Sequence, residues 1–187
     1  MSRPAVVACG ALAVDVRRIA RRRGWDLTVI PVPALLHNHP ERIEGAIAEL
    51  SAGHDVVAVA YGECGTHGAL DGYPRLEGSD CYDVFARSEV RAALDADPGT
   101  YFLTDFLART FEHTVWRELG LDRYPELRDE YFRHYTRVMW LAQRPTPATR
   151  AAAVRAAERL GLPLEVREVG DEGLERALEA LVGSAAG

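Results

Sequence analysis

The chain of 187 residues contains no lysine, and all 22 of its basic residues are arginine. This absence excludes Schiff-base chemistry on a lysine and a lysine general base. The glycine patterns G-x-G-x-x-G and G-x-x-x-x-G-K-[ST], which bind dinucleotides and phosphates, are also missing, as is the G-x-S-x-G turn of serine hydrolases. The sequence therefore argues against nucleotide binding and against a Ser-His-Asp hydrolase.

Long apolar runs and an excess of positive charge are absent as well. No segment reaches the ~20 apolar residues that a membrane-spanning helix needs, and the first residues, MSRPAVVACGALAV, lack the long apolar stretch of a signal peptide. The net charge of -6 argues against a nucleic-acid partner, because phosphate binding needs clustered positive charge. We therefore expect a cytoplasmic protein that binds neither membranes nor nucleic acid.

Segments with the pattern of strands alternate with segments with the pattern of helices. This alternation predicts an α/β fold with a mostly parallel sheet and helices on both faces. Length and an apolar content of 48% fit a single α/β domain, residues 1–187. Residues 65–80 are rich in Gly, Asp and Pro without a period, which predicts a long loop. The predicted strands are 5–9, 27–32, 54–61, 100–103, 138–142 and 164–169, and the predicted helices are 12–22, 40–50, 80–94, one from residue 104 to about 119, 125–135, 147–160 and 172–182.

The chain contains three cysteines, an odd number that argues against a disulfide framework. Cys9 closes the first predicted strand, and Cys64 lies just past the third. Cys81 follows the long loop at the start of a helix, where the helix dipole favours a thiolate. Because ligands bind at the carboxyl ends of parallel strands, we expect these three thiols to meet at one edge of the sheet.

Three convergent thiolates suit a metal centre. They can hold Zn²⁺ with a fourth position left for water, a substrate or a histidine, or an iron-sulfur cluster in which one iron has no protein ligand. The chain has no Cys-x-x-Cys pair, so the compact spacings of zinc ribbons and ferredoxins are absent. The alternative is that all three cysteines are small buried apolar residues.

Two histidines are the candidates to complete such a centre. His37 lies after the second predicted strand, and His67 lies three residues past Cys64. A neutral imidazole binds metals and carries protons near neutral pH. The alternative is that Asn38 caps the helix that begins at Pro40 and that the histidines are loop residues.

Several charged and polar side chains flank the cysteines. We assign Glu63 and Asp80, with His37, to the predicted catalytic group, in which the carboxylates contact the metal ligands or supply a general acid. Solvated loop charge is the alternative interpretation. The flanking residues are Tyr61, Glu63, Arg75, Asp80 and Asp83.

Five sequence blocks resemble the DUF1638 family of proteins of unknown function: ACGAL at 8–12, ALLHNHPERI at 34–43, YGECGTHGAL at 61–70, SDCYDVF at 79–85 and PGTYFLT at 98–104. The resemblance implies that the cysteines act as a unit, because these blocks contain them. Members of that family are often encountered near corrinoid methyltransferase genes, so the resemblance implies one-carbon or metal-cofactor metabolism. The chain departs from the family in the loop, where His67 replaces a smaller or amide residue. The residues carried over are Cys9, His37, Tyr61, Cys64, Gly65, Asp80 and Cys81.

The leading hypothesis is a metal-dependent enzyme, a lyase or a transferase, that acts on a small-molecule substrate at an open position of a three-cysteine zinc or iron-sulfur site. The first alternative is a metal carrier, a sensor or a partner-binding domain without catalysis. The second is a small-molecule-binding domain without metal, whose cysteines are buried apart from one another.

An aromatic-rich region lies between residues 116 and 135. We predict that these side chains belong to the core, and a homodimer surface is the alternative. The residues are Trp116, Tyr124, Tyr131, Phe132 and Tyr135.

Overall fold

The computed structural model describes residues 4–185, which form two compact units. The first unit contains the residues up to Val84 and those from Asp171 onward, and the second runs from Phe85 to Gly170. Each unit has a parallel three-stranded sheet of its own. The predicted α/β class with parallel strands is therefore confirmed, but the strands divide between two sheets. That the chain is a single domain stays a prediction.

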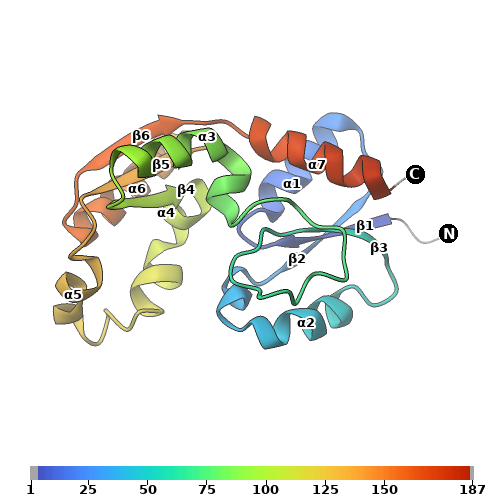
Figure 1. The fold of residues 1–187 in the computed structure, drawn as a ribbon, viewed down its shortest axis with the longest axis horizontal. Helices are drawn as coiled ribbons and strands as arrows, with labels where there is room; N and C mark the ends of the chain where they lie inside the picture. The colour runs from blue at the N-terminus through green and yellow to red at the C-terminus, as the bar shows by residue number, and fades with distance from the viewer. Residues whose placement is uncertain (1–3, 186–187) are drawn as a thin grey trace. The chain divides into compact units, whose positions relative to one another are not determined.

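The sheet of the first unit has the strand order β2-β1-β3. The side chains of the central strand β1 are buried from the second residue of the strand onward, which matches its continuous apolar sequence. Figure 1 shows α1 and α7 on one side of this sheet and α2 on the other. The elements are β1 (Pro4–Cys9), α1 (Ala13–Arg23), β2 (Thr28–Val32), the 3-10 turns η1 (Ala34–Asn38) and η2 (Pro40–Arg42), α2 (Ile43–Leu50), β3 (Asp55–Ala60) and α7 (Glu172–Ala185).

Ion pairs join α1 to α7 within this unit. Arg18 and Arg22 both bind the carboxylate of Asp171, at 2.6 and 3.2 Å, and Arg22 also binds Glu175 at 2.6 Å. Burial alone would raise the pKa of Asp171, but the hydrogen bonds from the two guanidinium groups lower it. The arginine-rich end of α1 thus serves the packing of the two helices.

The sheet of the second unit has the order β4-β5-β6. Its core lies between the sheet and two helices, α4 and α6, which pack on each other, and it includes the fully buried Trp140 of β5. The remaining elements are α3 (Cys81–Ala96), which begins in the first unit, β4 (Thr100–Thr104), α4 (Asp105–Phe111), the π-helical turn η3 (Glu112–Arg117), the 3-10 turn η4 (Pro125–Leu127), α5 (Arg128–Phe132), β5 (Arg137–Ala142), α6 (Pro147–Leu160) and β6 (Leu164–Glu168).

Local signals explain why α6 forms where the sequence predicts it. The Thr146 hydroxyl accepts a hydrogen bond from the Thr149 N–H, and the Thr149 hydroxyl accepts one from the Thr146 N–H, so that a capping box closes the first turn. Pro147 occupies the first turn, and Gly161 ends the helix with φ +72°. By contrast, the predicted helix 125–135 ends early, at Phe132, and the helix after β4 changes to π-helical geometry at Glu112.

The aromatic region is partly core and partly surface. Trp116 and Phe132 are buried, as predicted. The prediction is wrong for Tyr124, Tyr131 and Tyr135, which are exposed by 53%, 45% and 36%. No helix within residues 4–185 is both long enough and apolar enough to cross a membrane.

Candidate functional site

Cys9 and Tyr61 lie next to each other at the C-terminal edge of the first sheet. Ala8 in β1 pairs with Ala60 in β3. Cys9 directly follows Ala8 in the chain, and Tyr61 directly follows Ala60. Gly10 then turns the chain against the end of β2, so closely that a Cβ atom on it would lie 2.9 Å from a β2 carbonyl oxygen. The sheet register therefore brings the first thiol to the residue that directly follows the third strand.

A tight turn brings the second cysteine to the third. The Cys64 N–H donates a 2.7 Å hydrogen bond to the Ser79 carbonyl oxygen, two residues before Cys81. A Cβ atom on Gly62 would lie 3.2 Å from the Cα atom of Asp80, which is tighter than most Cβ contacts, so a side chain at this position would push the two segments apart. Cys64 itself has φ +44°, a conformation that residues other than glycine rarely adopt and that clusters at functional sites.

The loop between these cysteines is ordered by its own contacts. The Val59 N–H donates to the Pro74 carbonyl oxygen at 2.8 Å, which places the loop alongside β3. Two leucines anchor the loop in the interior, Leu70 with no exposed surface and Leu76 with 1%. The predicted long loop is confirmed, and it returns the chain to the sheet edge where Cys81 begins α3.

Burial raises the pKa of every thiol, and the charges of neighbouring groups add to this effect at Cys64 and Cys81. Burial raises the pKa of Cys9. Burial, the charge of Cys9 and the charge of Asp80 raise the pKa of Cys64 to about 12. The pKa of Cys81 lies well above its ordinary value, first because of burial and then because of Cys64, Cys9 and Asp80. Since the charge of Cys9 acts on Cys64, and the charges of both act on Cys81, the three thiols lie in one neighbourhood, which argues against cysteines buried apart.

Backbone N–H groups oppose this effect at all three sulfurs. Hydrogen bonds from the backbone lower the pKa of Cys9, Cys64 and Cys81, although burial outweighs them. Such donors stabilise the negative charge of a thiolate once its proton has left. The donors belong to Ala11 and Leu12 at Cys9, to Cys81 and Gly62 at Cys64, and to Cys81 itself at Cys81.

The thiols lie together without coordination geometry. Within the described residues, no group of three or more His, Cys, Asp or Glu side chains is arranged to hold a metal ion. A metal would therefore require the side chains to turn toward one point as their protons leave.

Tyr61 has a buried hydroxyl without a hydrogen-bond partner among the residues that the structure describes. The nearby hydroxyl lowers the pKa of the Cys9 thiol, and Cys9 in turn raises the pKa of Tyr61. The two groups nevertheless do not have the geometry of a hydrogen bond. Burial and the charges of all three thiols raise the pKa of Tyr61. A second buried hydroxyl without a partner in the described chain, that of Thr66, lies in the same turn. Sequence reasoning did not identify these orphan hydroxyls, because burial is not visible in the sequence.

The two predicted carboxylates have local partners. Glu63 accepts a hydrogen bond from the His67 N–H at 2.9 Å and pairs with Arg75 at 3.1 Å. Asp80 accepts the Asp83 N–H at 2.9 Å and so caps α3, while its charge raises the pKa of the neighbouring thiols. The structure thus brings Asp80 to the thiols, and it ties Glu63 to the loop.

His37 is exposed, and its Nδ1 atom lies 2.6 Å from the Ala34 carbonyl oxygen within the turn η1. No described contact joins it to the thiols, so its role as a ligand stays a prediction. The alternative assignment of Asn38 as a helix cap is wrong, because η2 begins after His39 without a side-chain cap. Pro40 does occupy the first position of η2, as predicted.

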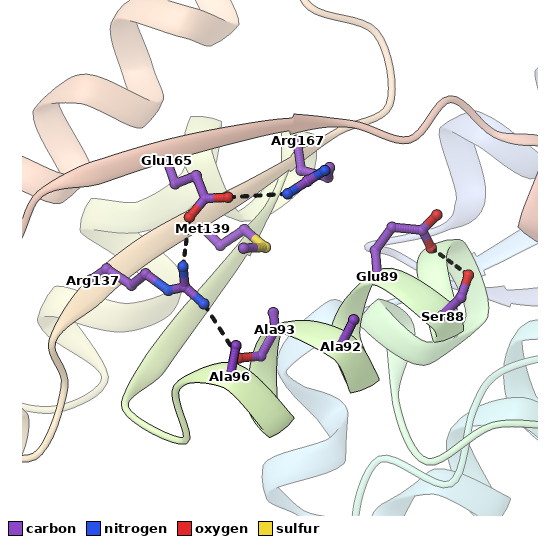
Figure 2. Close-up of a pocket in the computed structure, with 9 residues that line it drawn as sticks. All are labelled: Ser88, Glu89, Ala92, Ala93, Ala96, Arg137, Met139, Glu165 and Arg167. Carbon is purple, nitrogen blue, oxygen red and sulfur yellow. Dashed lines mark hydrogen bonds and ion pairs between the residues drawn. The ribbon is translucent and has the colours of Figure 1, made fainter.

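The second unit contains a pocket of about 330 Å³ that sequence reasoning did not predict. α3 forms one wall with small side chains and Glu89, and β5 and β6 form the other with Met139 and three charged side chains (Figure 2). The charged groups pair with each other: Glu165 binds Arg137 at 2.7 Å and Arg167 at 3.2 Å. The lining residues are Ser88, Glu89, Ala92, Ala93, Ala96, Arg137, Met139, Glu165 and Arg167.

The end of β4 carries a buried carboxylate with a structural explanation. Asp105 accepts hydrogen bonds from Trp140 Nε1 at 2.9 Å and from the Arg144 N–H at 2.8 Å, which tie β4 to the end of β5. Thr104 accepts the Leu107 N–H and caps α4, as the sequence predicts. Neither residue has an unsatisfied group that would point to a ligand.

The fold and the cysteine-lined sheet edge define a class, that of α/β proteins with two small parallel sheets and converging thiols on the first. Within that class, the chain belongs to the DUF1638 family, described as "Protein of unknown function (DUF1638)", which matches residues 31–178. No curated protein and no solved structure matches the chain. Cys64 and Cys81 lie inside the matched residues, whereas Cys9 lies before them.

Proposed function

We propose that the protein binds a metal centre, a zinc ion or an iron-sulfur cluster, through Cys9, Cys64 and Cys81. An open position on this metal would bind a small-molecule substrate, which makes the protein a metal-dependent enzyme of the lyase or transferase type. The observation that supports this proposal is the convergence of three thiols, from three separate segments, around Tyr61.

The electrostatics of the site favour a cation. Three buried thiolates in one neighbourhood repel one another, so the thiols keep their protons while no cation is bound. A divalent or iron centre removes this penalty, because it binds the thiolates and displaces their protons. Thiolates are also the ligands that zinc and iron-sulfur clusters prefer.

The position of the site suits catalysis. It lies at the C-terminal edge of a parallel sheet, where α/β proteins bind their ligands. Three protein ligands leave the fourth position of zinc for a substrate heteroatom, which the metal polarises as a Lewis acid. The resemblance to DUF1638 proteins connects this chemistry with one-carbon or corrinoid metabolism. A fourth protein ligand such as His37 would instead close the site and favour a carrier or a sensor.

The test is metal and sulfide analysis of protein purified without oxygen. We expect one zinc ion, or iron with acid-labile sulfide, per chain in the wild-type protein and a large loss in Cys64→Ser. Ser88→Ala, a change at an exposed residue of the second unit, is the control and keeps the metal. A wild-type protein without metal, or a Cys64→Ser variant with full metal content, would contradict the proposal.

The ligand count separates catalysis from storage. His37→Ala tests the predicted fourth ligand, and His39→Ala, at a second exposed histidine two residues away, is the matched control. Unchanged metal content in both variants indicates an open position. Loss of metal in the His37 variant alone indicates a closed site and favours the carrier or sensor.

A further inference from the structure

The pocket of the second unit has no part in the proposed metal site, and all of its lining residues lie between Phe85 and Gly170. Arg137 joins its two walls, because it donates to the Ala93 carbonyl oxygen on α3 at 3.2 Å and binds Glu165 on β6 at 2.7 Å. Its Nε atom donates to the Thr100 hydroxyl at 2.9 Å. All three nitrogen atoms of this guanidinium thus have partners within the protein, and Arg137 fixes the walls rather than binding a ligand.

Arg167 on β6 is the arginine of the pocket with donors to spare. Its side chain is 53% exposed, and within the described residues its guanidinium pairs only with Glu165, through Nη2 at 3.2 Å. Since Glu165 also pairs with Arg137, it compensates the charge of Arg167 only in part. A guanidinium has five N–H donors in a planar fork that matches a carboxylate. Arg167 therefore offers the pocket a group that binds anions.

The wall on α3 offers the opposite charge. Glu89 is half-buried and accepts a hydrogen bond from the Ser88 hydroxyl at 2.8 Å. In the described part of the chain, no basic side chain forms an ion pair with it. A carboxylate gains most from a charged donor such as an ammonium group. The two walls thus present one cation and one anion whose charges are not fully compensated.

The remaining lining determines which ligands fit. The two arginines and two glutamates of the lining give no net charge, which does not suit a phosphate or another multiply charged anion. The buried Met139 and the small side chains of Ala92 and Ala96 add apolar surface (Figure 2). The volume of about 330 Å³ lies at the lower end of the range for small-molecule sites. The pocket therefore matches a small, neutral molecule with one positive and one negative end.

We infer that this pocket binds a small zwitterion, an aliphatic amino acid. Its carboxylate binds Arg167, its ammonium group binds Glu89, and its carbon chain contacts Met139. Both ends of an amino acid are charged at neutral pH, so each finds an opposite charge on one wall. This binding site requires neither the thiols nor a metal and is therefore independent of the proposed function.

The experiment measures binding to the full chain by isothermal titration calorimetry. The probes are two isomers, L-norvaline and 5-aminopentanoate, which differ in the spacing of their charges. Removal of the amino group turns both into pentanoate, and removal of the carboxylate turns both into butylamine. We expect the wild-type chain to bind at least one isomer at millimolar concentration or below, about tenfold to a hundredfold more tightly than either analogue, which is the range for a hydrogen bond to a charged group.

Two variants each remove one charge. Arg167→Gln should reduce the affinity for the amino acid to that for butylamine and leave butylamine binding unchanged. Glu89→Gln should reduce it to that for pentanoate and leave pentanoate binding unchanged. Ala92→Leu fills the pocket at an exposed position and should abolish binding, whereas Ala151→Leu, at an exposed position of α6, is the matched control and should not.

Three results would overturn the inference: no binding of either isomer to the wild-type chain, equal affinity for an isomer and its analogues, or full affinity in Ala92→Leu. Circular dichroism checks the fold of each variant. The three changed residues of the pocket are exposed or half-buried, so we expect all three variants to fold. If one charge variant does not fold, the other and Ala92→Leu still decide the question. Each of these results leaves the metal site untouched.

Discussion

Removing the Tyr61 hydroxyl should stabilise the metal-free protein. The ring of Tyr61 is fully buried, and its hydroxyl has no hydrogen-bond partner within the described chain. An unsatisfied buried donor costs about 1–3 kcal/mol, whereas in the unfolded chain the same hydroxyl is hydrated. Tyr61→Phe keeps the ring and its packing and removes only the oxygen atom. We therefore expect the free energy of unfolding to rise by about 1–2 kcal/mol.

Urea unfolding of metal-free protein, followed by fluorescence and circular dichroism, measures this change. The two probes must report the same transition, because a chain with two compact units can unfold in two steps. A shift in the midpoint at constant slope gives the difference in free energy. Tyr73→Phe serves as the control, with an expected change within about 0.5 kcal/mol. A loss of more than about 1 kcal/mol in Tyr61→Phe would show that the hydroxyl has a stabilising partner in the apoprotein, and would refute the reasoning.

Three further predictions follow from other contacts. Asp171→Asn should reduce the free energy of unfolding by about 1–3 kcal/mol at pH 7, because it breaks the charge pairing with Arg18 and Arg22. The folded state lowers the pKa of Asp171, so the carboxylate contributes its full stability above the pKa that it has in the unfolded chain, and this stability is lost as the pH falls through the folded-state pKa. A difference in the free energy of unfolding between wild type and Asp171→Asn that stays constant to acid pH would contradict this prediction. Cys64 in metal-free protein should react slowly with iodoacetamide at pH 7 and faster as the pH approaches about 12, and a rate at pH 7 equal to that of the unfolded chain would count against the raised pKa. Gly62→Ala should destabilise the protein by about 1–3 kcal/mol, because the new Cβ atom meets the backbone of Asp80. Gly45→Ala is the control and should not destabilise the protein, because no atom lies within 4 Å of the added Cβ. Equal melting temperatures of the two variants would contradict this view of the turn.

The sequence predicts the order of elements well, because each element has a local signal. The strand β1 is an uninterrupted apolar run, and α6 has a cap, a proline in its first turn and a final glycine. The division into two sheets was not predicted, because the same alternation of strands and helices fits one sheet of six strands or two sheets of three. Which strands pair depends on contacts that are distant along the chain.

The candidate site shows the same limit. Cys9 could be placed at a strand end from the sequence, and the sheet register then brings it to Tyr61. That Cys64 and Cys81 approach each other depends on the return of the loop 65–80 to the sheet edge, for which the sequence has no period. The ion pairs of α1 with α7 were also not predicted, because Arg18 and Asp171 lie 153 residues apart.

X-ray absorption at the metal edge of protein purified without oxygen tests the metal site most directly. We expect one bound metal centre per chain with three sulfur ligands from the protein, at about 2.3 Å if the metal is zinc, and loss of sulfur ligation when any one of Cys9, Cys64 and Cys81 is replaced by serine. A protein that holds no metal, or a metal whose sulfur ligation survives all three replacements, would contradict it.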